Sequence, residues 1–146
     1  MYLVSDIIYN SSRPSPENYW TFKLFLEQQL PRIFAGFRDQ AKQLTEKQTL
    51  VLRNLLKIWK EWQVFSGDVL VGLESAIVHE SSWQKRVTTD PALNKRYQKT
   101  KKKYNKESLF DLERLCRRRG VLCEGTREDM ARRLVNLKMF VREQEE

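Results

Sequence analysis

Residue types that metal and catalytic sites depend on are scarce in this sequence of 146 residues. It contains two cysteines and one histidine, which cannot supply the four ligands of a structural zinc site. The histidine, His79, falls at a predicted helix end, so no histidine-centred dyad is available, and no glycine-rich phosphate loop occurs. We therefore expect a non-enzymatic protein with no cofactor.

Long apolar runs are also missing. No stretch approaches the roughly 18–20 apolar residues that span a bilayer. The N-terminus lacks a basic leader, and Asp6 interrupts its short apolar run, so we expect no signal peptide. Cys116 and Cys123 fit a reduced, intracellular setting as small apolar side chains. This length predicts one soluble domain, alone or with a small module.

The excess of positive charge is confined to one segment. The net charge is +8, and residues 79–107 contribute +6 of it, from nine Lys and Arg against three Asp and Glu. The pattern divides the chain into a domain at 1–78, a basic linker at 79–107 and a module at 108–146. We expect the linker to be flexible or loosely helical, and either to bind nucleic acid or to be a solvated tether.

Local signals in the first block predict helices only, because no segment alternates as a strand does. Five helices are expected, over residues 1–10, 16–30, 31–43, 45–62 and 69–77. Pro16 and Pro31 each open a helix, and Thr45 with Gln48 forms a capping box. Trp20, Trp59 and Trp62 occupy apolar helix positions, so we interpret them as core or interface residues.

The opening helix carries two kinds of surface. Tyr2, Asp6 and Asn10 recur every four residues and share one face, which predicts either a hydrogen-bonding surface or a solvated one. Nothing precedes this helix to cover its apolar face, so a neighbouring chain covers it or the sequence is a fragment. That face is formed by Leu3, Val4, Ile7 and Ile8.

The last block predicts two helices joined by a turn. Ser108 caps the first helix, Gly120 ends it, and Thr126 with Asp129 caps the second. Two helices in so short a segment bury little area, so this module should be marginal alone. The second helix turns four residues inward, which are Met130, Leu134, Leu137 and Phe140.

This block resembles the SAP motif, a helix–turn–helix module that binds DNA or RNA. The matching residues are Leu109, Leu112, Cys116, Gly120, Val121, Gly125, Arg127, Arg133 and Leu134. The resemblance implies contacts from basic residues around the turn, because guanidinium groups beside a helix N-terminus attract phosphate. The alternative is that these arginines only keep a small module soluble. The expected nucleic-acid contacts are Arg118, Arg119, Arg127 and Arg132, with Lys99, Lys101, Lys102 and Lys103 of the linker.

The first block resembles the CID, a domain that binds the C-terminal repeat tail of RNA polymerase II. Residues 2–11 match its fourth helix, and residues 55–62 with Val64 and Phe65 match its seventh. The resemblance implies an all-α, right-handed α-solenoid of the CID and ENTH/VHS type, with helices four to eight present. Members that read phosphoserine carry arginine at the positions of Asn54 and Trp62. The implied peptide groove contains Tyr2, Asp6, Asn10, Arg53 and Lys57.

Together the two blocks resemble the SURP-motif, SR-related splicing proteins associated with the U-two snRNP, above all the plant-type members. The residues that carry this resemblance are Ser5-Asp6, Trp59, Trp62 and the segment 112–117. It implies a nuclear splicing factor that binds RNA, together with splicing proteins or the polymerase tail. Two alternatives stay open: a chromatin-associated, DNA-binding SAP protein with a tail-binding CID, and a truncated gene product without independent activity.

Overall fold

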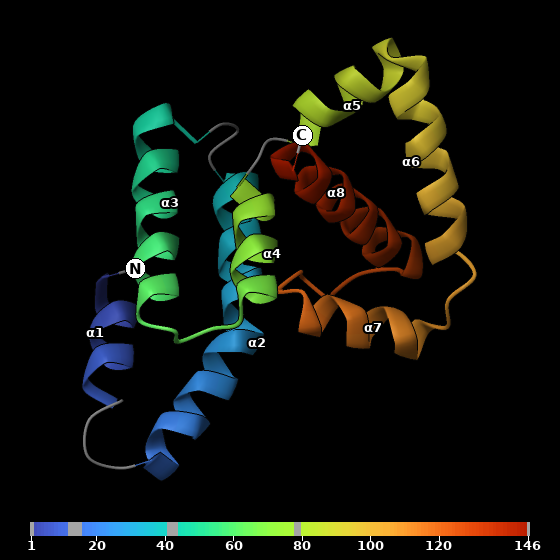
Figure 1. Ribbon diagram of the computed structural model, residues 1–146. Helices are drawn as coiled ribbons and strands as arrows, with labels where there is room; N and C mark the ends of the chain where they lie inside the picture. The colour runs from blue at the N-terminus through green and yellow to red at the C-terminus, as the bar shows by residue number, and fades with distance from the viewer. Residues whose placement is uncertain (1, 12–15, 41–43, 78–79, 146) are drawn as a thin grey trace.

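The computed structural model describes residues 2–11, 16–40, 44–77 and 80–145, and the side chains of 2, 11, 16–19, 38–40 and 80–84 fall outside that description. Within these ranges every regular element is an α-helix, which confirms the all-α prediction (Figure 1). The helices are α1 (Tyr2–Ser11), α2 (Pro16–Gln40), α3 (Glu46–Glu61), α4 (Gly67–Ile77), α5 (Glu80–Thr89), α6 (Pro91–Tyr104), α7 (Leu109–Arg118) and α8 (Arg127–Glu145).

Capping residues set the helix ends where the sequence predicts them. The Thr45 hydroxyl accepts the Gln48 backbone N–H, and the Gln48 side chain accepts the Thr45 backbone N–H, which completes the capping box of α3. Ser108 caps α7 by accepting the backbone N–H of Asp111. These local signals are confirmed because each depends on atoms within one turn of the chain.

Pro31 does not open a new helix. It lies inside α2, so residues 16–30 and 31–40 form one helix, and the described part of the first block holds four helices in place of five. Residues 41–43 of the predicted third helix lie outside the described residues. An interior proline costs about 3 kcal/mol, because it removes a hydrogen bond and crowds the preceding turn. The neighbouring Leu30 and Phe34 are both fully buried, and their packing offsets that cost. The helix changes direction part-way along its length (Figure 1).

Most of the predicted linker is helical, which corrects the flexible alternative for residues 79–107. Asp90 caps α6 by accepting the backbone N–H groups of Ala92 and Leu93, and Pro91 opens the helix. α6 packs along α8 and buries Thr100. Its apolar contacts with Val135, Met139 and Phe140 of α8 come from Leu93, Tyr97 and Tyr104.

Two apolar centres meet at α4. The larger one joins α1 to α4 around the fully buried Trp59, Phe34 and Leu30. The other lies between α7 and α8, with Leu112 and Cys116 fully buried, and Val71 of α4 packs against it. α7 and α8 therefore do not form an isolated module. α4 and α6 pack against them and cover apolar surface that α7 and α8 would otherwise expose to water.

The contact between α4 and the end of α7 is made by backbone. Gly120 has a φ of +62° and ends α7 in a Schellman motif, in which Val121 N–H donates to Cys116 and Gly120 N–H to Arg117. A methyl group at Gly72 would lie 1.6 Å from the carbonyl oxygen of Arg119. α4 therefore accepts the turn only because residue 72 has no side chain.

Candidate peptide and nucleic-acid surfaces

One buried hydrogen bond fixes α1 against α3. The indole N–H of Trp59 donates to the hydroxyl of Ser5 over 3.1 Å, with both side chains buried. Ile8 lies one turn further along α1 and packs into the same core. Because one side of α1 is held this way, the opposite side is presented to solvent in a defined orientation.

Asp6 and Asn10 lie exposed on α1, one turn apart. The Asn10 amide nitrogen donates to the backbone carbonyl of Asp6 over 2.8 Å, and among the described contacts none occupies its amide oxygen. Among the described contacts, none occupies the Asp6 carboxylate. The Tyr2 side chain lies outside the described residues, so its predicted place in this row stays a prediction.

Exposed apolar side chains accompany these polar groups. On α1, Leu3 is 71% exposed and Ile7 37% exposed, whereas Ile8 is buried and Val4 packs against the core. The predicted uncovered apolar face is therefore covered in part by the chain itself. Trp62, at the end of α3, contacts Tyr9 of α1 with ring centroids 5.4 Å apart. Trp59 is confirmed as a core residue, whereas Trp62 and Trp20 are 43% and 56% exposed, so neither belongs to the core.

Arg53 and Lys57 do not extend this surface directly. Arg53 pairs with Glu74 of α4 over 3.2 Å, so it lies on the side of α3 that faces α4. Lys57 is exposed one turn later. Among the described residues, neither cation contacts Asp6 or Asn10, and the candidate peptide surface is therefore centred on α1 and the end of α3.

Comparison with known proteins identifies a family for the first half of the chain. The model of the CID domain matches residues 1–73. The chain belongs to the CID domain family. No solved structure matches it.

Two curated relatives extend the CID match. "Regulation of nuclear pre-mRNA domain-containing protein 1A" from human is 31% identical over 86 residues, covering 59% of this chain and 25% of that protein. "Protein RRC1-like" from Arabidopsis thaliana is 27% identical over 171 aligned positions, covering 93% of this chain and 18% of that protein. The chain thus spans a quarter or less of the length of the relatives it matches.

Beyond the CID region, the structure uses two arginines of the SAP-like turn internally. Arg127 donates to the backbone carbonyls of Asn105 and Glu107, at 2.6 and 2.5 Å, and so holds the α6–α7 turn. Arg133 donates to the carbonyls of Leu122 and Glu124. A planar guanidinium suits such paired acceptors. The guanidinium of Arg127 is therefore already hydrogen-bonded within the protein in the absence of nucleic acid.

The other three arginines predicted to contact nucleic acid differ in whether they already have a partner within the protein. Arg119 pairs with Asp68 of α4 over 3.0 Å, and Arg132 pairs with Asp129 over 3.0 Å. Arg118 is exposed at the end of α7. Of the four predicted arginine contacts, Arg118 alone makes no ion pair or side-chain hydrogen bond with a described residue.

The four predicted lysine contacts are all exposed on α6, at residues 99, 101, 102 and 103. By helical spacing, Lys99 and Lys102 lie on the side of the helix away from α8, whereas Lys103 borders a hollow that α6 forms with α7 and α8. The structure thus places these four positive charges of the predicted linker on a helix, with their side chains exposed.

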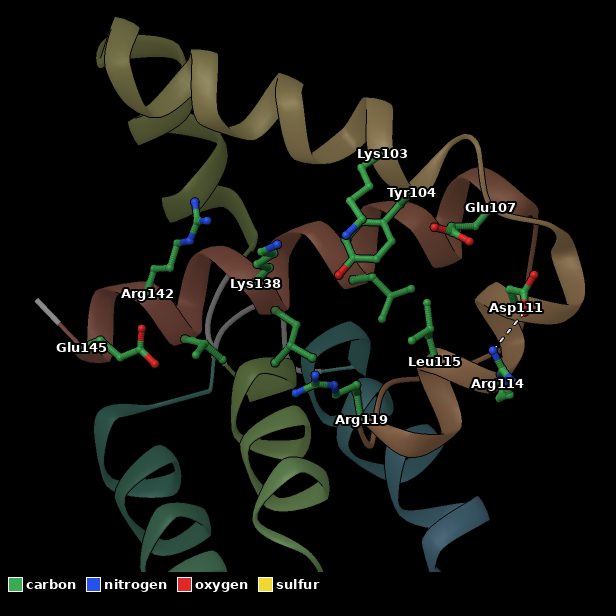
Figure 2. Close-up of a pocket in the computed structure, with 13 residues that line it drawn as sticks. Lys103, Tyr104, Glu107, Asp111, Arg114, Leu115, Arg119, Lys138, Arg142 and Glu145 are labelled. Atoms are coloured by element: carbon green, nitrogen blue, oxygen red, sulfur yellow. Dashed lines mark hydrogen bonds and ion pairs between the residues drawn. The ribbon is translucent and has the colours of Figure 1, made fainter.

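A hollow between α6, α7 and α8 is the feature that sequence reasoning missed (Figure 2). Tyr104 lines it, and burial raises the pKa of its phenol, which stays a neutral hydrogen-bonding group at physiological pH. The available signal was the apolar spacing of Leu93, Tyr97 and Tyr104, which predicts a packed helix in place of a linker. In the described part of the chain, no cluster of His, Cys, Asp or Glu could hold a metal. None of its helices is long and apolar enough to cross a membrane.

Proposed function

We propose that this chain is a non-enzymatic part of a nuclear RNA-processing factor that acts in pre-mRNA splicing. Its CID region binds a peptide from the polymerase II tail or from a splicing protein, while α6 and the SAP-like helices bind RNA. The SURP-motif, SR-related splicing proteins are the family in which we place it. The names of the animal relatives, which refer to regulation of nuclear pre-mRNA, support the broader role in nuclear RNA processing.

The observation that carries the peptide-binding part is the row of exposed groups on α1. Asp6 and Asn10 offer hydrogen-bond acceptors to a peptide backbone, and Leu3 and Ile7 beside them offer apolar contact. A peptide surface needs both, because apolar contact supplies affinity and placed polar groups supply orientation. The Ser5–Trp59 hydrogen bond preorganises the row, which lowers the cost of binding.

The RNA-binding part is supported by the exposed lysines of α6. Cations on a helix neutralise phosphates and release counterions, which gives binding without sequence preference. The arginines of the SAP-like turn contribute less, because Arg119, Arg127 and Arg132 already have partners in the protein.

Peptide titration tests the CID surface. A fluorescent, unphosphorylated tail-repeat peptide is titrated with the chain and with its Asp6→Ala and Asn10→Ala variants. Each variant removes about one hydrogen bond, so Kd should rise three- to tenfold. Glu128→Ala, an exposed acid at the start of α8, is the matched control and should bind as the parent does. Unchanged affinity in both α1 variants would contradict peptide binding by Asp6 and Asn10 and would favour the alternative that they form a solvated face.

Salt titration tests the RNA surface. For single-stranded RNA, log Kd should rise with log salt concentration by about 0.7 per phosphate contact, and Lys99→Gln with Lys102→Gln should reduce that slope. Lys60→Gln on α3 serves as the control. Absence of binding to RNA contradicts the proposal, and tighter binding to duplex DNA than to RNA favours the chromatin-associated alternative.

A further inference from the structure

The hollow between α6, α7 and α8 has an apolar floor and a charged rim. Its volume is about 570 Å³. Figure 2 shows the Tyr104 ring between α6 and α8, with charged side chains drawn from all three helices around it. A space of this size is typical of sites for small ligands or single residues of a polymer. The floor is formed by Leu115, Leu134, Leu137 and Val141.

The rim carries more positive than negative charge. Among its cations, Arg114 is paired with Asp111 over 3.2 Å, and Arg119 with Asp68. The other three make no ion pair with any described residue; they are Lys103, Lys138 and Arg142. Two carboxylates, Glu107 and Glu145, also line the hollow without an ion pair in the described part of the chain. One uncompensated positive charge therefore remains among the unpaired groups.

The cations are close enough to affect one another. Burial lowers the pKa of Lys138, and repulsion from Arg142, Lys103 and Arg119 lowers it further. A bound anion would relieve that repulsion. The cluster therefore favours a negatively charged ligand, with Lys103 and Arg142 exposed at its rim and Lys138 partly buried.

Two features favour a nucleic acid over a phosphorylated peptide. Lys103 connects the rim to the exposed lysines of α6, since Lys99 lies one turn before it, so positive charge continues outward from the hollow as a polyphosphate chain requires. The Tyr104 ring and the leucine floor offer a flat apolar surface of the kind on which bases stack. A duplex keeps its bases stacked inside, so only a single strand could insert one.

We propose that this hollow binds one nucleotide of single-stranded RNA, with the base against Tyr104 and the adjoining phosphate between Lys138 and Arg142. The proposal rests on the RNA-binding part of the proposed function and adds to it a defined site. Apart from Lys103 and Arg119, the residues that line it are not among the nucleic-acid contacts predicted from the sequence. Binding there also clamps α6 to α8, because the nucleotide contacts both helices.

Anisotropy of a labelled 12-nucleotide, mixed-sequence RNA tests the proposal on the whole chain. The double variant Lys138→Gln, Arg142→Gln should raise Kd about tenfold and lower the log–log salt slope by about 0.7, since the contact with one phosphate is lost. Lys60→Gln, an exposed lysine on α3, removes charge elsewhere and should have little effect. Circular dichroism confirms that the double variant is folded.

Crosslinking supplies a second measurement. RNA containing 4-thiouridine should crosslink to the peptide that contains Tyr104 in the parent chain, and much less in the double variant. If RNA binds but the double variant binds as tightly as Lys60→Gln, the hollow is not the site, while the proposed function stands. If no RNA binds, both fail. A phosphopeptide that binds the hollow while RNA does not compete with it also overturns the proposal.

Discussion

Replacing Gly72 by alanine should destabilise the protein, although alanine favours helix formation. The added methyl group would lie 1.6 Å from the Arg119 carbonyl oxygen and 2.7 Å from its carbonyl carbon. Ordinary contact begins at 3.4 Å, so α4 and the end of α7 would have to separate by about 2 Å. Both contacting atoms belong to backbone, which cannot rotate away as a flexible side chain can.

The magnitude follows from two opposing effects. Overpacking of this kind costs about 1–3 kcal/mol, and separating α4 from α7 also loosens Val71, which packs against the α7–α8 centre. Alanine in place of a helical glycine returns about 0.5–1 kcal/mol. We expect a net loss of about 1–2 kcal/mol in the free energy of unfolding.

Urea denaturation followed by circular dichroism measures this loss. The control is Gly36→Ala in α2, where an added methyl group meets nothing within 4 Å, so stability should rise by about 0.5–1 kcal/mol. Hydrogen exchange of the Val121 amide, which donates to Cys116 at the end of α7, should accelerate in Gly72→Ala alone. Equal stability of the two variants would refute the close contact between α4 and the α7 turn.

Two further predictions concern titratable groups in the last two helices. Burial raises the pKa of the Cys116 thiol to about 12, so at pH 8 a thiol reagent should modify the partly exposed Cys123 first and Cys116 only after unfolding. Hydrogen bonds from the Thr126 backbone and hydroxyl lower the pKa of Asp129 below its usual 3.8. Its contribution to stability is therefore complete above that pH and is lost as the pH falls through the native value. Asp129→Asn should flatten the acid side of the stability profile measured by denaturation, and an unchanged profile would contradict this.

Sequence reasoning succeeded where structure depends on neighbouring residues. The capping box at Thr45 and the end of α7 at Gly120 are confirmed, because each is decided by atoms within a few positions along the chain. Pro31 shows the limit of such reasoning. The burial of Leu30 and Phe34 on either side depends on helices distant in sequence, and it overrides the local preference to end the helix.

For the basic segment, predicted to be flexible or loosely helical, the flexible alternative was wrong for a different reason, whereas the helical one agrees with α5 and α6. Its many lysines indicate a solvated linker, yet Leu93, Tyr97, Thr100 and Tyr104 follow a helical period and face α8. Lys99 and Lys102 lie on the opposite side of the same helix. The low average hydrophobicity of the segment favoured a linker, whereas the spacing of its few apolar residues predicts a packed helix.

For the candidate site residues, the sequence predicted solvent exposure of a side chain better than it predicted which ion pairs form. Asp6 and Asn10 are exposed, as their helix spacing predicts. No local pattern indicates that Arg53 reaches Glu74 or that Arg119 reaches Asp68, because both pairs join different helices. The nucleic-acid contacts taken from the SAP resemblance therefore stay predictions. The structure indicates which of these arginines already have a partner within the protein.

The distribution of partners explains why the lysines of α6 are better candidates for phosphate contacts than the arginines of the turn. A guanidinium offers several donors in a fixed plane, so it is readily used inside the protein, as Arg127 is on two backbone carbonyls. Such an arginine can bind phosphate only by giving up those bonds. Lys99 and Lys102 make no ion pair with any described residue, so they lose nothing but hydration when phosphate binds. Net charge read from a sequence counts both kinds of cation equally, whereas binding depends on those left without an internal partner.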